Sequence, residues 1–167
     1  MATVTLKGKP VHTSGDLPAK GTQAPDFRLT RGSLEDVSLG SFAGRRKILT
    51  INPSFDTSTC QATARRFNQE AARLPNTVIL AISADLPFAQ SRFCEAEGLS
   101  NVIPLSMIRD RDFGRHYGLL LVDGPLEGLL ARAVIVLDEH DRVLYSELVP
   151  EIGTEPNYAS ALGTLGA

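Results

Sequence analysis

The sequence is poor in cysteine and histidine, and it lacks strong charge of either sign. Its 167 residues include two cysteines and three histidines, and the formal net charge is -2. A chain of this length can bury a hydrophobic core without disulfide or metal staples, so the two cysteines need not be structural. The densest basic cluster is Arg45-Arg46-Lys47, which is no basic face or stripe, and no apolar run is long enough to cross a bilayer. We therefore expect neither a nucleic-acid partner nor a membrane segment.

Further absences narrow the chemistry. The start of the chain shows no basic leader followed by an apolar stretch, so we expect a cytoplasmic protein in a reducing compartment. There, sparse cysteines indicate free thiols or transient redox chemistry rather than permanent bridges. His12, His116 and His140 lack ligand spacing with a cysteine, which argues against zinc. No P-loop, dinucleotide-binding fingerprint or C-x-x-C motif is present.

The hydrophobic pattern alternates between strand-like and helix-like stretches. It predicts buried strands over 47–52 and 78–83, each followed by a helix, over 58–74 and 86–97. Hairpins are predicted over 3–13 and 133–148, with an edge strand over 24–29, a short helix over 113–117, and a closing helix that Thr154 opens. Helices between buried strands imply crossover units and a central sheet. The order is that of a thioredoxin-like α/β fold with an N-terminal β-hairpin, in a single domain over 1–167.

The most informative segment is Pro53-Ser54-Phe55-Asp56-Thr57-Ser58-Thr59-Cys60, which joins a buried strand to a helix. In α/β sheets, ligands bind outside the carboxyl ends of the strands. A thiol in the first turn of a helix lies at the positive end of the helix dipole, which favours the thiolate. Thr57 can place its hydroxyl beside that sulfur and donate to an incoming oxygen, while Pro53 would stiffen the approach and shield the thiolate.

Each of these residues also has a purely structural interpretation. Cys60 could be a small core residue and Thr57 only an N-cap. Arg132, which directly precedes the apolar run 133–137, could be a strand-end arginine with its head in water. Cys94, in the second predicted helix, could be a packed thiol, and spacing alone does not decide this. For Cys60 and Thr57, the strand-end position of Pro53 and the hydroxyl three residues before Cys60 favour the catalytic interpretation. For Arg132, the structural interpretation is the better one on these residues alone.

Three segments resemble those of thiol peroxidases, the atypical 2-Cys branch of the peroxiredoxins. Pro53 to Cys60 is similar to that family's active-site motif, and 83–94 is similar to the segment that carries its resolving cysteine. A third match runs from Asp123-Gly124-Pro125-Leu126 to Ala131-Arg132-Ala133-Val134. The resemblance spans nearly the whole chain, including the N-terminal hairpin.

This resemblance implies a site and a reaction. Cys60 would be the peroxidatic cysteine, with Thr57, Pro53 and Arg132 completing its pocket, and Cys94 would resolve it through an intramolecular disulfide. Hydrogen peroxide and organic hydroperoxides would be the substrates, thioredoxin the reductant, and the protein a homodimer. No organic or metal cofactor is implied. Two other functions use the same cysteines: a thiol–disulfide oxidoreductase, which the lack of C-x-x-C disfavours, and a redox sensor without turnover.

Overall fold

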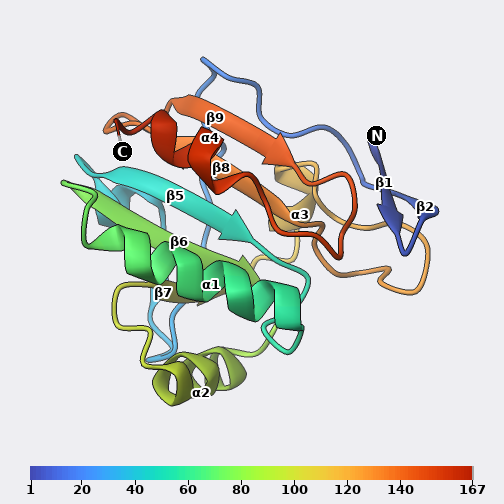
Figure 1. The fold of residues 1–167 in the computed structure, drawn as a ribbon, viewed down its shortest axis with the longest axis horizontal. Helices are drawn as coiled ribbons and strands as arrows, with labels where there is room; N and C mark the ends of the chain where they lie inside the picture. The colour runs from blue at the N-terminus through green and yellow to red at the C-terminus, as the bar shows by residue number, and fades with distance from the viewer. Residues whose placement is uncertain (167) are drawn as a thin grey trace.

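The computed structural model describes residues 1–166 and contains one seven-stranded sheet and a separate two-stranded hairpin. The strand order in the large sheet is β4-β3-β7-β6-β5-β8-β9, and the hairpin pairs β1 with β2 (Figure 1). The strands are β1 (Thr3–Leu6), β2 (Lys9–His12), β3 (Leu29–Thr30), β4 (Asp36–Val37), β5 (Arg46–Ile51), β6 (Thr77–Ser83), β7 (Ile103–Ser106), β8 (Ala133–Leu137) and β9 (Val143–Leu148). The helices are η1 (Leu39–Phe42), α1 (Ser58–Ala71), α2 (Pro87–Glu97), α3 (Phe113–His116) and α4 (Tyr158–Gly163). The thioredoxin-like α/β fold and its N-terminal hairpin are confirmed.

The centre of the sheet is a parallel unit with two crossover helices. β5 pairs with β6 and β6 pairs with β7, both in parallel register, and α1 and α2 connect them. β8 then adds antiparallel to β5, so that Ile51 faces Ala133. Because parallel strands end at the same edge of a sheet, the loops that lead into α1 and α2 leave side by side.

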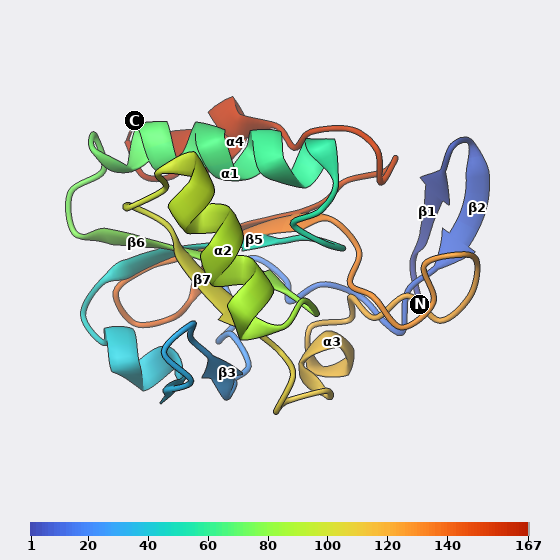
Figure 2. The ribbon, with the colours of Figure 1, turned by 90° about the horizontal axis from the view of Figure 1, so that it is seen from below.

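Alternating side chains of the central strands build two hydrophobic cores, one on each face of the sheet. On one face, Ile48 and Val134 pack with residues of α1, α2 and α4, among them Phe67 and Cys94. The other face, with Leu49, packs against η1, α3 and the segments around them. Figure 2 shows α1 and α4 above the sheet and α3 below it. No helix within residues 1–166 is long and apolar enough to cross a membrane.

Two predicted elements are wrong in their position. The segment 24–29 is not a strand before Leu29, because the Asp26 carboxylate accepts the backbone N–H groups of Phe27 and Leu39 and thereby bends the chain. The closing helix begins at Tyr158 rather than Thr154, which instead closes a turn by bonding to the Glu151 carbonyl oxygen.

Other element bounds are shifted by less, and two strands, β4 and β7, were missed. Helix α1 ends at Ala71 instead of residue 74, while α2 ends before Gly98 as expected, with Gly98 in the left-handed conformation (φ 66°). β7 escaped the pattern because Pro104 interrupts a short segment, and proline rarely occupies a central strand.

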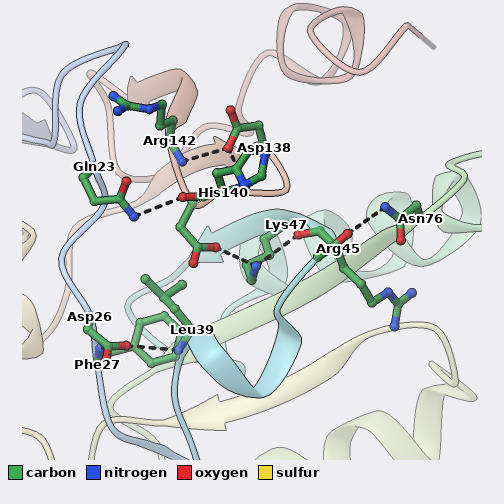
Figure 3. Close-up of polar contacts among 12 residues, drawn as sticks. Gln23, Asp26, Phe27, Leu39, Arg45, Lys47, Asn76, Asp138, His140 and Arg142 are labelled. Carbon is green, nitrogen blue, oxygen red and sulfur yellow. Dashed lines mark hydrogen bonds and ion pairs between the residues drawn. The ribbon is translucent and has the colours of Figure 1, made fainter.

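A buried polar cluster lies at the amino end of β5, at the opposite end of the strand from Pro53 and Cys60. Lys47 is fully buried, and its Nζ donates to the Asp141 carboxylate at 2.6 Å and to the Arg45 carbonyl oxygen at 3.0 Å (Figure 3). A buried ammonium requires such a paired carboxylate, because an unpaired one is costly to desolvate. The β8–β9 turn, which provides Asp141, is thereby fixed to this end of the sheet.

Candidate active site

Cys60 lies in the first turn of α1, directly beyond the carboxyl end of β5. Thr57 is the N-cap: its Oγ1 accepts the backbone N–H of Cys60 at 3.3 Å and donates to the Ser54 carbonyl oxygen at 3.2 Å. Cys60 has no exposed surface, whereas Thr57 is exposed and Pro53 is buried. The positive end of the α1 dipole therefore lies beside the sulfur, and the Thr57 hydroxyl lies on the solvent side of the same turn.

Arg132 is a buried cation at the same end of β5. Only 2% of it is exposed, and its guanidinium donates through Nε to the Ile152 carbonyl oxygen at 2.8 Å and through Nη1 to Asn52 Oδ1 at 3.1 Å. Both acceptors are neutral, and within residues 1–166 no ion pair includes Arg132 and no hydrogen bond uses its Nη2. A buried charge without a carboxylate is costly, and such groups occur where a protein needs them for function.

The segment after β9 connects Arg132 to the turn that holds Cys60. The Ile152 carbonyl oxygen binds Arg132, and the next carbonyl oxygen, of Gly153, accepts the hydroxyl of Thr59 at 3.0 Å. On the other side, Asn52 binds Arg132 and directly precedes Pro53. The structure thus brings Pro53, Thr57, Cys60 and Arg132 to one end of β5.

Asp85 fixes the loop before α1 to the loop before α2. Its carboxylate accepts the Ser54 hydroxyl and the Phe55 backbone N–H, each at 2.8 Å, and the Ser83 hydroxyl at 2.6 Å. Because Ser54 and Phe55 belong to the Cys60 loop and Asp85 lies two residues before α2, one carboxylate joins the beginnings of both cysteine helices.

Cys94 lies near the carboxyl end of α2 and is also a free, buried thiol. It is 9% exposed, and burial raises the pKa of its thiol to about 11. Phe93, beside it, stacks on Phe55 with ring centroids 5.3 Å apart and an interplanar angle of 18°. Arg65 of α1 binds Glu97 of α2 through two hydrogen bonds, at 3.0 and 3.1 Å. The two cysteine helices are therefore joined by an aromatic stack and an ion pair, with the thiols unbonded.

Three polar residues of this site were missed from the sequence. Asn52 could have been found, because it directly follows the strand at the position where ligands of α/β sheets gather. Asp85 stands inside the segment that carries Cys94, but nothing distinguished it from a surface acid. Glu151, which lies beside the Ile152 and Gly153 carbonyl groups, follows a strand without any motif. Within residues 1–166, no group of three or more His, Cys, Asp or Glu side chains could hold a metal ion.

Comparison of the sequence with known proteins identifies the family of this chain. The model of the Redoxin family matches residues 19–162. The thiol peroxidases of Mycobacterium bovis and Mycobacterium tuberculosis are each 51% identical to the chain over 167 residues, which is 100% of both sequences.

Solved structures agree with the sequence comparison. A peroxiredoxin-like protein from Aquifex aeolicus superposes with a TM-score of 0.93 and 37% identity, covering 99% of this chain and 96% of its own. The thiol peroxidase from Chromobacterium violaceum gives a TM-score of 0.92 at 27% identity, covering 98% and 95%. The match includes the strand-end loop of Cys60, the helix of Cys94 and the N-terminal hairpin, and the chain belongs to the thiol peroxidases of the redoxin family.

Proposed function

We propose that this chain reduces hydroperoxides with Cys60 as the nucleophile. The proposal rests on the buried guanidinium of Arg132, which no carboxylate in the described part of the chain pairs and which lies at the end of β5 where the first turn of α1 holds Cys60. A thiolate attacks the terminal oxygen of ROOH, and the O–O bond breaks as the S–O bond forms. Cys60 becomes a sulfenic acid, and the leaving oxygen takes up a proton to give ROH.

Arg132 and Thr57 are the groups that assist this step. The unused Nη2 of Arg132 can donate to the peroxide oxygen that Cys60 attacks. The Thr57 hydroxyl donates to Ser54 in the structure and can turn to an incoming oxygen, because hydroxyl donors rotate freely. Pro53 has no backbone N–H, so it fills the wall of the site without offering a competing donor.

Cys94 is the proposed resolving residue. Its thiol attacks the sulfenic sulfur of Cys60, so that an intramolecular disulfide forms and water leaves. A dithiol reductant, for which we propose thioredoxin, then restores both thiols by exchange and takes the disulfide itself. The cycle balances with one peroxide reduced for each dithiol oxidised, in a cytoplasmic setting where disulfides are transient.

The decisive experiment is peroxide consumption coupled to thioredoxin, its reductase and NADPH. Turnover with hydrogen peroxide and with organic hydroperoxides supports the proposal. Catalysis of insulin reduction by this chain in the presence of a small dithiol and without thioredoxin, with no turnover of peroxides, would favour a thiol–disulfide oxidoreductase. A single oxidation without recycling would favour a redox sensor.

Quaternary structure and domain organisation complete the proposal. We propose a homodimer formed through the face around the site, where Leu86 and Phe88 are 53% and 64% exposed; Phe55, in contrast, is buried beneath Phe93 and cannot contribute. Light scattering at micromolar concentration should give twice the 18.0 kDa of one chain. We also propose that 1–167, of which Ala167 lies outside the described residues, unfold as one domain in a single transition.

A further inference from the structure

The N-terminal hairpin contacts the segment that holds Arg132. The Thr5 backbone N–H donates to the Pro150 carbonyl oxygen at 2.8 Å, and the Ile152 N–H donates to the Thr5 carbonyl oxygen at 2.9 Å. The carbonyl oxygen of the same Ile152 accepts Nε of Arg132 at 2.8 Å. One residue therefore joins β1 to the guanidinium, since its N–H binds the hairpin and its carbonyl oxygen binds Arg132.

Glu151 is the side chain that fastens this contact. Its carboxylate accepts the Thr5 hydroxyl, the Lys7 backbone N–H at 2.9 Å and the Gly8 backbone N–H at 3.2 Å. Lys7 and Gly8 both have positive φ, 51° and 79°, which makes the tight hairpin turn that offers these two groups to one acceptor. The hydrogen bonds from Thr5, Gly8 and Lys7 lower the pKa of Glu151 to about 2, so the carboxylate stays ionised throughout turnover.

The other strand of the hairpin holds the loop that leads into β8. The Val122 N–H donates to the His12 carbonyl oxygen at 3.0 Å, and the His12 N–H donates to the Asp123 carboxylate at 2.8 Å. Gly124 approaches Val11 so closely that an added Cβ would lie 2.5 Å from the valine Cγ1. The hairpin thus contacts the segment before β8, at residues 122–124, and the segment after β9, at residues 150–152.

We propose that the N-terminal hairpin positions the Arg132 guanidinium and that Glu151 is its anchoring residue. Figure 1 shows the hairpin outside the large sheet, and isolated two-stranded hairpins are marginally stable in water. The hairpin is therefore held in place by these contacts. In return, the hairpin fixes the Ile152 carbonyl group, which orients Arg132. The inference rests on the catalytic role proposed for Arg132.

The test is Glu151→Gln, which keeps the shape of the side chain. Its amide turns one acceptor into a donor that faces the Lys7 or Gly8 N–H. We expect the reaction of reduced Cys60 with peroxide to slow about 10-fold, since misplacement by 1 Å can cost up to about 10²-fold. Disulfide formation after that step should keep its rate, because Arg132 has no part in it.

The matched control is Asp138→Asn at the opposite end of β8. Asp138 also accepts two backbone N–H groups of a turn, from His140 at 2.8 Å and Arg142 at 3.0 Å (Figure 3). This variant should lose stability in the same way yet react with peroxide at the normal rate. If both variants slow the reaction equally, the effect is general destabilisation and the positioning role is overturned.

A double variant separates this inference from the function on which it rests. In an Arg132→Met background, Glu151→Gln should cause no further slowing, because the group that it positions is gone. Independent slowing in that background would overturn the inference, as would a normal rate in Glu151→Gln alone; Arg132 would then keep its proposed role. If Arg132→Met itself reacts normally, both the role of Arg132 and the inference fail.

Discussion

The two cysteines lie at opposite ends of their helices. Cys60 is in the first turn of α1, where Thr57 caps the helix with its side chain. Cys94 is in the last turn of α2, and its carbonyl oxygen accepts the N–H groups of Gly98 and Leu99 that close the helix. The helix dipole therefore presents its positive end to one thiol and its negative end to the other. Burial raises the pKa of Cys94 to about 11, and its position near the negative end acts in the same direction.

This difference indicates a division of labour between the helices. The surroundings of Cys60 provide the amino end of a helix and a guanidinium that is bound, among the described residues, only to neutral oxygens, as the proposed attack on peroxide requires. The surroundings of Cys94 keep its thiol neutral. Cys94 therefore does not compete with Cys60 for peroxide before the sulfenic acid has formed. The α2 helix also begins without a side-chain cap, at Leu86, so it is the less firmly fixed of the two.

The largest effect on activity should come from replacing each cysteine, Cys60 or Cys94, by serine. Cys60→Ser should abolish peroxide reduction, because a hydroxyl of ordinary acidity is a far weaker nucleophile than a thiolate. Cys94→Ser should keep the first turnover and lose thioredoxin-driven recycling, with sulfenic acid accumulating on Cys60. Mass spectrometry after one equivalent of peroxide measures both results.

The same experiment tests where the disulfide closes. Oxidised wild-type protein should migrate as a monomer on a non-reducing denaturing gel, because the proposed bond joins two cysteines of one chain. A disulfide-linked dimer would mean that resolution occurs between chains. Residual activity above a few per cent in Cys60→Ser would remove Cys60 from the nucleophile role.

The next effect should come from the groups around Cys60. Thr57→Val deletes one hydroxyl and should slow the peroxide step by about 10²–10³-fold, as losing a transition-state donor does in other enzymes. Arg132→Met should slow it by a similar factor. Neither change should alter the rate of disulfide formation, since both residues are on the Cys60 side of the comparison. Single-turnover rates with acid quench measure each step, and equal slowing of both would contradict the assignment.

The sequence predicted the Cys60 side of the site better than the Cys94 side. A β-branched run ending at Pro53, followed by a hydroxyl and a thiol at helical spacing, places Cys60 without further knowledge. The partners of Arg132 could not be predicted, because Ile152 contributes only a backbone carbonyl, and which carbonyl a side chain meets depends on tertiary packing. For the same reason the pattern missed Glu151, whose acceptors are filled by a hairpin more than 140 positions away.

The pH dependence of disulfide formation should reveal the surroundings of Cys94. Below the pKa of an attacking thiol, each unit of pH raises the thiolate fraction about tenfold. If Cys94 attacks from its buried position, the rate should rise in this way through pH 10, toward the pKa of about 11. A break near the ordinary value, roughly 8.5, would show that α2 unwinds and exposes Cys94 first. A flat profile would contradict attack by Cys94. Because the chain has no tryptophan, quenched-flow mass spectrometry is the suitable measurement.

The smallest expected effect concerns the close contact between Gly32 and Ser91 of α2. Gly32, in the β3–β4 turn, packs so tightly on this helix that an added Cβ would lie 1.8 Å from Ser91 Oγ and 3.2 Å from its Cβ. Gly32→Ala should therefore push α2 outward and lower the free energy of unfolding by about 1 kcal/mol. If α2 opens during resolution, disulfide formation should become faster, by up to about 5-fold for 1 kcal/mol, with the peroxide step unchanged.

Two further variants show whether the effect of Gly32→Ala arises from its contact with Ser91. Adding Ser91→Ala to Gly32→Ala removes the closer clash and should restore most of the stability and the slower resolution. Gly40→Ala is the control, because its Cβ would meet nothing nearer than Ser38 Oγ at 3.6 Å. Urea unfolding measures the stability of each variant, and quenched flow measures its resolution rate. If Gly32→Ala destabilises the protein but leaves resolution at the wild-type rate, α2 stays folded while the disulfide forms. Any opening during resolution would then lie in the firmly capped α1, which reverses the comparison between the two cysteines.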